Sequence, residues 1–230
     1  MTEEAVVELN SNGNGEKPAD ATLEAMARAG VWYGRKKSKT NPRMREYIYG
    51  TRNGIEIFDL PQTLARLEKA GAFLKECVRE GGGILFVGTT PPVQELTRAA
   101  AAQLHVPHVI VRWLGGTLTN FKTLSGRIQY YLKLRADRDS GRLVKYTKKE
   151  QSGFDKEIRR LERLFGGLET MKELPKAIVV AGAEAHVTAL RECKRLHIPV
   201  VAIANSDTNP ELVDYIIPAN DKARSSVAWI

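Results

Sequence analysis

The sequence predicts an α/β protein with a flavodoxin-like, doubly wound sheet of five parallel strands. Three observations lead to this prediction: short continuous apolar runs, helical patterns between them, and one long helical insertion. Continuous apolar runs are typical of parallel strands that are covered on both faces. Hydrophobic residues make up 43% of the 230 positions, which is enough for a sizeable core.

The N-terminal segment differs in character from the rest of the chain. Residues 1–20 contain a stretch rich in Gly, Asn and Pro without apolar periodicity, which predicts a disordered leader. The first residues are acidic and resemble neither a signal peptide nor an Arg-rich transit peptide. A short helix is expected over 21–28, ending at Gly30.

A basic arm and a β-hairpin come next. Residues 35–45, RKKSKTNPRMR, hold six basic residues and no acidic one, and form either a solvated loop or an arm that contacts phosphate. Two alternating segments around Asn53 and Gly54 predict the β-hairpin. Pro61 starts a helix that extends to the glycines at 81–83.

Five apolar runs predict the strands of the main sheet. They lie at 84–88, 106–111, 176–181, 199–204 and 214–218. Helices are expected over 93–104, over 186–196 and from about residue 220 onward. The α/β domain, with the arm and the β-hairpin, is therefore expected to span 21–119 and 169–230.

The long gap between the second and third strands predicts an antiparallel helical hairpin, of coiled-coil type, inserted at 120–168. Each half carries a heptad seam that is apolar except for Arg135. The seams are Phe121, Leu124, Ile128, Tyr131 and Arg135 in the first half, and Phe154, Ile158, Leu161, Phe165 and Leu168 in the second. The segment 137–141, DRDSG, is expected to form the turn.

The charge of the chain is concentrated in this insertion. The net charge is +8 at pH 7, and residues 120–165 hold 13 basic against 6 acidic residues. Alternating charges would stabilise the helices better, so a one-sided excess favours a surface that binds an anion or docks a partner. Nucleic acid is the first candidate and an anionic membrane the second. A basic protein with no anionic partner is the alternative.

Nothing in the sequence predicts a metal centre, a bound cofactor or a disulfide. The two cysteines lack a CxxC spacing and the four histidines lack metal-ligand spacing, so reduced thiols in a cytosol are expected. No apolar run is long enough to span a membrane.

The carboxyl ends of the strands are where such a sheet would bind a ligand. Gly115 and Gly116 follow a strand and precede a helix, which outlines a phosphate site, but no Lys-Ser/Thr follows them. Other polar residues could meet at this edge, although such residues are usually turn formers and helix caps: Thr89, Glu184, His186 and Asp207. We therefore expect no catalytic residue. The alternative is a nucleotide- or sugar-phosphate-binding enzyme on a flavodoxin-like fold.

Several motifs resemble the bacterial ribosomal protein S-two family of the small ribosomal subunit. The most specific is RWLGGTLTNFKT at 112–123. Further matches are NPRMREYIYGTRNGIEIFDL at 41–60, ILFVGT at 84–89, YTKKE at 146–150, LERLFGG at 161–167 and IPVVAIANSDTNPELVDYIIPAND at 198–221. The sequence departs from the family where Trp32 and Arg35 stand at positions of common histidines, and where Asn205 replaces an aspartate.

The resemblance implies a three-layer α/β domain with a protruding helical hairpin. It also implies a structural, non-enzymatic role in translation, on the solvent side of the cytoplasmic small subunit between head and body. The implied partners are small-subunit ribosomal RNA, neighbouring ribosomal proteins and, in many bacteria, ribosomal protein S-one. No small-molecule substrate and no membrane partner are implied.

RNA contacts are expected from basic side chains, through phosphate and shape more than through base edges. The candidates are Arg35, Lys36, Lys37, Lys39, Arg43, Arg45, Arg112, Lys122, Arg127, Lys145, Lys148 and Lys149. Trp32 and Tyr33 could stack on a base or pack against the hairpin. At the junction after the second strand, Trp113 is expected to be packed, and Thr119 or Asn120 to cap the following helix.

Overall fold

The computed structural model describes residues 18–230. The disordered leader predicted over 1–20 lies almost wholly outside these residues. The first helix, α1, spans Pro18–Arg28 and so begins three residues before the predicted start. Its residues Leu23 and Met26 pack beside Val93 and Val227 of two later helices, so α1 is part of the main body.

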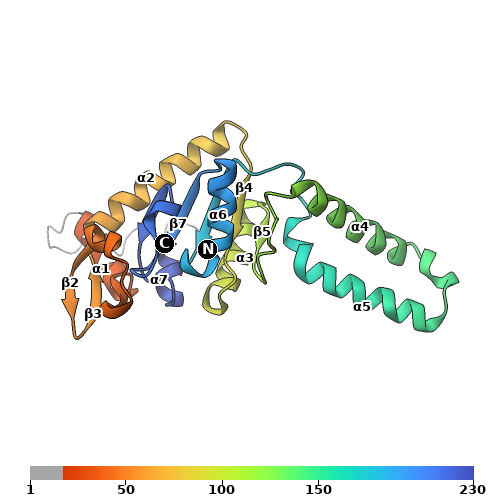
Figure 1. Ribbon diagram of the computed structural model, residues 1–230, viewed down its shortest axis with the longest axis horizontal. Coiled ribbons are helices and arrows are strands. Elements are labelled where there is room, and N and C mark those ends of the chain that lie inside the picture. Colours follow the sequence, from red (N-terminus) through yellow and green to blue (C-terminus); the bar gives the residue numbers. More distant parts are fainter. Residues whose placement is uncertain (1–17) are drawn as a thin grey trace, which may run out of the picture.

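Five parallel strands form the main sheet in the order β5-β4-β6-β7-β8 (Figure 1). The strands are β4 (Ile84–Val87), β5 (His108–Val109), β6 (Ala177–Ala181), β7 (Val200–Ala204) and β8 (Tyr215–Pro218). In chain order this is 2-1-3-4-5, the flavodoxin-like arrangement that the sequence predicts. The prediction of an α/β doubly wound fold is confirmed.

The edge strand β5 is much shorter than the predicted segment 106–111. Its pairing with β4 is limited to two registers, Phe86 with His108 and Val87 with Val109. The Phe86 amide donates a hydrogen bond to the Pro107 carbonyl, and the Gly88 amide donates one to the Val109 carbonyl. The chain then leaves the sheet toward the glycine turn, which ends the strand early.

Helices cover both faces of this sheet. On one face, Ala70 of α2 (Leu60–Arg79) packs against Val201 and Ile217, and α3 (Pro91–Leu104) and α7 (Arg224–Trp229) lie beside it. On the other, Leu190 and Cys193 of α6 (Val187–Leu196) belong to the largest apolar cluster, with β4, β6 and β7. Each helix presents one apolar stripe to the sheet, as expected for a layered domain.

A second, antiparallel sheet of three strands lies at one end of the molecule, in the order β1-β3-β2 (Figure 1). The strands are β1 (Tyr33–Lys36), β2 (Ile48–Arg52) and β3 (Ile55–Phe58). The pair β2–β3 is the predicted β-hairpin. The strand β1 was not predicted, because its sequence YGRK has no apolar alternation. The predicted arm is therefore part strand and part 3-10 turns, at Lys37–Lys39 and Pro42–Tyr47.

The helical hairpin protrudes from the opposite end of the molecule (Figure 1). It consists of α4 (Phe121–Asp139) and α5 (Lys148–Phe165). The predicted seams are largely buried, at Leu124, Ile128, Tyr131, Ile158, Leu161 and Phe165. At its root the seam is continuous with the core of the main domain, because one apolar cluster contains residues of both.

The turn of this hairpin lies later than predicted. Helix α4 continues through 137–139, and the tip comprises residues 140–147 with a short 3-10 turn at Arg142–Lys145. Gly141 ends the helix in the left-handed region, with φ of 73°. Thr147 then caps α5 by a reciprocal capping box with Glu150.

Candidate nucleic-acid interface

The glycine turn after β5 holds an anion that belongs to the chain itself. The Glu192 carboxylate projects from α6 into the turn, where Oε1 accepts from Trp113 Nε1 at 3.0 Å and from the Gly116 amide at 2.8 Å. Its Oε2 accepts from the Leu118 and Thr119 amides at 3.0 and 3.1 Å, and from the Thr119 hydroxyl at 3.2 Å. The amides that outline a phosphate site therefore bind a carboxylate.

The Glu192 carboxylate is stabilised in its charged form despite its position. Burial raises its pKa, but the hydrogen bonds from Trp113 and from the Leu118, Gly116 and Thr119 amides outweigh this effect, so the pKa is lowered. At neutral pH the glycine turn is thus occupied by an internal anion. This geometry leaves the nucleotide-enzyme alternative without its candidate phosphate site.

The predictions for this turn are partly right. Trp113 is packed, as expected, against the main apolar cluster. The predicted cap of helix α4 is wrong: the N-cap residue Asn120 makes no side-chain capping hydrogen bond, and the Thr119 hydroxyl donates to Glu192. Glu192 itself was not predicted as a member of this site. Arg112 is exposed and has no side-chain partner among the residues that the structure describes.

A second polar group lies at the carboxyl ends of the main strands. Arg35 donates to Asp207 Oδ2 through Nε at 2.9 Å and to Asp221 Oδ1 through Nη2 at 3.3 Å. Asp221 is almost fully buried and also accepts from the Asn205 amide at 2.8 Å. Arg35 therefore neutralises one buried and one partly buried carboxylate within the fold. Although Arg35 is a predicted RNA contact, its charge is balanced by two acidic side chains of the same chain.

His186 and Thr89, which the sequence placed at this edge, do contact each other. His186 Nε2 lies 3.1 Å from the Thr89 amide and 3.0 Å from its hydroxyl, and Nδ1 lies 2.7 Å from the Gly182 carbonyl oxygen. Burial lowers the pKa of His186, while burial, followed by Asp207, raises the pKa of Glu184. Within residues 18–230, no group of three acidic, His or Cys side chains could hold a metal ion.

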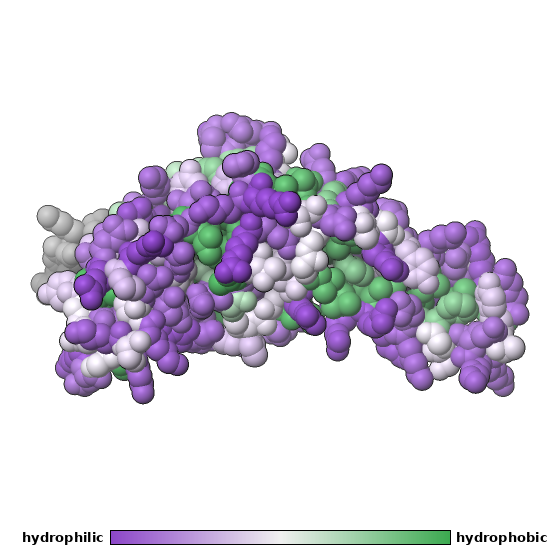
Figure 2. Space-filling model, viewed as in Figure 1, coloured by the Kyte–Doolittle hydropathy of each residue, from purple (hydrophilic) through white to green (hydrophobic). Residues whose placement is uncertain are grey.

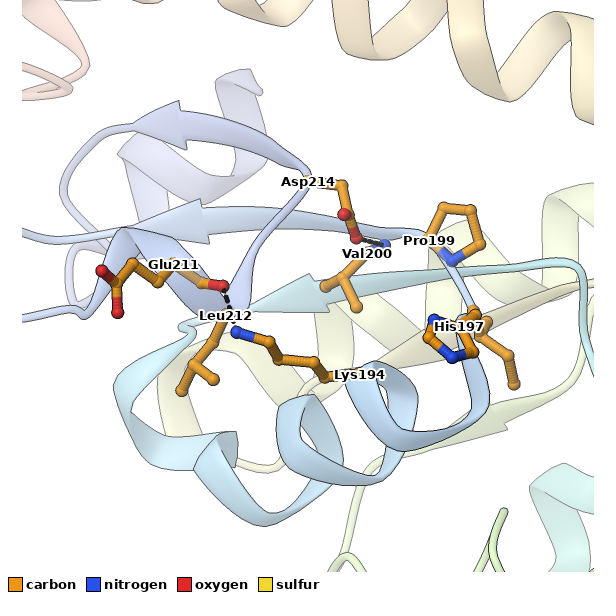
Figure 3. Close-up of a pocket in the computed structure, with 8 residues that line it drawn as sticks. Lys194, His197, Pro199, Val200, Glu211, Leu212 and Asp214 are labelled. Atoms are coloured by element: carbon orange, nitrogen blue, oxygen red, sulfur yellow. Dashed lines mark hydrogen bonds between the residues drawn. The ribbon is translucent and has the colours of Figure 1, made fainter.

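A pocket of about 400 Å³ opens at the other end of the strands, beside the amino end of β7 (Figure 3). Most of its polar groups are engaged within the chain. The Lys194 ammonium donates to the Glu211 carbonyl at 3.2 Å, and Asp214 accepts from the Val200 amide at 2.8 Å. This edge carries the amino ends of the strands, whereas ligands of doubly wound sheets bind at the carboxyl ends.

The basic residues of the arm lie on and next to the small sheet. The exposed side chains of Lys36, Lys37, Lys39 and Arg45 make no hydrogen bond or ion pair with any residue from 18 onward. Arg43 pairs with Glu211 at 2.6 Å, but both side chains are more than half exposed, so the pair is weak and easily exchanged. The arm therefore presents unneutralised positive charge to solvent.

The predicted contacts on the helical hairpin are also exposed. Lys122 and Arg127 project from α4, Lys145 from the tip, and Lys148 and Lys149 from the first turn of α5. Cations at a helix N-terminus oppose the helix dipole. Their presence there is not explained by the stability of α5, and it fits a surface that meets an anion.

The structure does not bring the two basic surfaces together. The arm lies by the small sheet at one end, and the hairpin extends from the other end (Figure 1). In the space-filling view, hydrophilic residues cover much of both ends and also of the face between them (Figure 2). The candidate interface therefore consists of two separate regions, with Arg112 near the root of the hairpin.

Comparison with known proteins is decisive for the family. A family model described as ribosomal protein S2 matches residues 26–230. The chain belongs to the ribosomal protein S2 family. The suspected relationship is thus confirmed over nearly the whole described chain, and it gives no support to the enzyme alternative.

Relatives named small ribosomal subunit protein uS2 share this similarity along most of their length. The protein of Thermus thermophilus is 41% identical over 213 residues, covering 93% of this chain and 83% of its own. The Roseiflexus castenholzii protein is 39% identical, covering 91% and 80%. The Nocardia farcinica protein is 41% identical, covering 92% and 74%. No helix from residue 18 onward is long and apolar enough to cross a membrane.

Proposed function

We propose that this S2 chain is a structural component of the small ribosomal subunit that binds its RNA and neighbouring ribosomal proteins. The observation that carries the proposal is the protruding hairpin with its 13 basic and 6 acidic residues. Four of its arginines are paired with acids: Arg135, Arg138, Arg142 and Arg160. The other nine cations have no ion pair with residues 18–230.

The proposed contacts are phosphate contacts by Lys and Arg, which release counterions from RNA. They comprise Lys36, Lys37, Lys39, Arg43 and Arg45 on the arm, Arg112 at the junction, and Lys122, Arg127, Lys145, Lys148 and Lys149 on the hairpin. Arg35 takes a different part: it ties β1 to the main sheet and so holds the arm in place.

Charge reversal on the hairpin tests this role. The variant carries Glu at Arg127, Lys145, Lys148 and Lys149, and incorporation into small subunits is measured by sedimentation. A matched control carries Glu at Lys69, Lys75, Lys172 and Lys176, which are exposed, have no ion pair with residues 18–230 and belong to neither the arm nor the hairpin. We expect strongly reduced incorporation of the first variant only. Equal incorporation of both variants would exclude the RNA role of the hairpin.

Sedimentation of the wild-type chain separates a resident subunit protein from a basic adaptor that meets the ribosome transiently. A resident protein stays with small subunits at low and at high salt. An adaptor is released as salt rises, and a chain found free at both salt concentrations contradicts the proposal.

We include ribosomal protein S-one among the proposed neighbours. Family membership is the support for this part of the proposal. Subunits purified without this chain should then lack S-one, and adding the chain back should restore it. Subunits that retain S-one without this chain would contradict the recruitment.

A further inference from the structure

The outer face of the small sheet combines aromatic, aliphatic and basic side chains. Cross-strand partners share a face, so the register places Tyr33, Ile57 and Gly50 in one row and Lys36, Ile55 and Arg52 in the next. The opposite face carries Phe58, which is 2% exposed, and is directed into the protein. The two rows therefore lie on the solvent side.

The first row offers an open and largely apolar surface. The Tyr33 side chain is 43% exposed, and its ring lies 4.5 Å from that of Trp32. Ile57 is half-buried and belongs to none of the apolar clusters found in residues 18–230. A Cβ added to Gly50 would meet no atom within 4 Å, so the row is open at its far end. A planar ring fits against such a surface.

The second row supplies positive charge. Lys36 and Arg52 flank Ile55 and are exposed, and their side chains have no hydrogen-bond or ion-pair partner among residues 18–230. The strands place no acidic side chain on this face. Their one acid, Glu56, is 5% exposed on the other face, where it accepts a hydrogen bond from Thr51 at 2.7 Å.

We infer that this face binds a segment of unpaired RNA, with a base stacked on Tyr33 and Ile57 and the adjoining phosphates next to Lys36 and Arg52. Bases in a duplex are covered by their neighbours, whereas an unpaired base exposes its π-face to an aromatic ring. The charge of the second row is complementary to phosphate. This inference rests on the proposed function, but it assigns base stacking to a site at the far end from the hairpin.

The test uses probes that differ only in their bases. Binding of a labelled, unstructured RNA oligomer of about ten nucleotides is compared with that of an abasic oligomer with the same number of phosphates. We expect the wild-type chain to bind the base-bearing oligomer about tenfold more tightly. Equal affinity for the two probes would overturn the inference, and so would equal affinity for an acidic peptide of the same charge.

Variants locate the stacking site. Tyr33→Ala should remove the preference for bases, Tyr33→Phe should keep it, and Gly50→Val should remove it by filling the open end of the row. Leu104→Ala is the control, because Leu104 is an apolar side chain that is 61% exposed on α3, outside the arm and the helical hairpin. A preference that survives both Tyr33→Ala and Gly50→Val in folded protein would overturn the inference.

A short RNA duplex separates this inference from the proposed function. Binding of the duplex without any preference between the oligomers contradicts only the stacking site. Failure to bind duplex, oligomer and abasic probe at low salt contradicts the proposed function as well. Melting curves of each variant confirm that lost binding is not lost folding.

Discussion

Glu192 joins helix α6 to the glycine turn from which the helical hairpin starts. Glu192 receives hydrogen bonds from both ends of the turn, at Trp113 and at Thr119. A Gln side chain offers one carbonyl oxygen and adds an N–H₂ group that these donors cannot accept from. The charged carboxylate is therefore required, and an uncharged substitute leaves amide donors unsatisfied.

Glu192→Gln should lower the free energy of unfolding by about 2–3 kcal/mol at neutral pH, because hydrogen bonds to a buried charge are lost. The measurement is denaturant unfolding. Glu162→Gln is the control, an exposed acid of α5 without a partner among residues 18–230, with an expected change within about 0.5 kcal/mol. A change as small in Glu192→Gln would contradict the role of the carboxylate.

The difference between wild type and Glu192→Gln should also depend on pH. The folded pKa of Glu192 is lowered from its usual 4.5, so the stabilising contribution is complete above pH 4.5 and disappears as pH falls through the folded value. The two unfolding curves should converge in acid. A gap that stays constant down to the lowest pH at which both proteins fold would argue against this charge.

The neighbouring thiol is expected to be unreactive in the folded protein. Burial, and next the Glu192 carboxylate, raise the pKa of Cys193 to about 12, so the nucleophilic thiolate is scarce at pH 8. Peptide mass spectrometry after iodoacetamide treatment should show alkylation of Cys193 only in denaturant. Equal rates with and without denaturant would disprove this protection.

At the scale of elements, the helical hairpin combines a buried seam with weak points that face solvent. Gly126 of α4 and Gly153 of α5 are exposed, and a Cβ at either would meet no atom within 4 Å. Glycine in a helix interior destabilises it relative to alanine. This destabilisation is offset by the buried seam, by the capping box of α5 and by the Arg135–Glu169 ion pair at 2.7 Å.

Alanine at either exposed glycine should therefore stabilise the protein, by about 0.5–1 kcal/mol each. Gly116→Ala should do the opposite, because Gly116 has φ of 87° in the turn. Thermal or denaturant unfolding compares the three variants. A loss of stability in Gly126→Ala or Gly153→Ala would contradict this expectation, because it would mean that a side chain is not tolerated at that position of the folded helix.

The elements differ in how far the sequence could predict them. The main strands and both seams are continuous or periodic patterns, and all were recovered. Strand β1 was not, because Gly34, Arg35 and Lys36 have no local strand signal and pair with β3 only through tertiary contacts. Glu192 was missed for a related reason. An acidic residue in a helix of 10 residues is expected on the surface, and the groups that donate hydrogen bonds to Glu192 lie 73 to 79 positions away in the chain.

At the scale of the whole molecule, the α/β domain separates two basic surfaces (Figure 1). Two separated surfaces can contact two parts of one RNA, or an RNA and a protein, at the same time. Linked contacts raise the overall affinity beyond that of either surface alone. The arrangement suits a protein that holds distant parts of an assembly in place.

Salt dependence measures how many phosphates the hairpin contacts. Replacing Arg127, Lys145, Lys148 and Lys149 with Gln should lower the slope of log affinity against log salt by about 3, since each lost phosphate contact removes about 0.7–0.9. The same change at Lys69, Lys75, Lys172 and Lys176 should leave the slope unaltered. Identical slopes for all three proteins would mean that these hairpin cations do not meet phosphate.

The long reach of Glu192 has a consequence for the newly made chain. The hairpin is complete at Phe165, but the carboxylate that orients its root is added only with residue 192. At about 5–20 residues per second, synthesis needs roughly 1–5 s to cover that interval. During this time the amides of the glycine turn lack the carboxylate that accepts their hydrogen bonds, and the turn is completed only once residue 192 has been added.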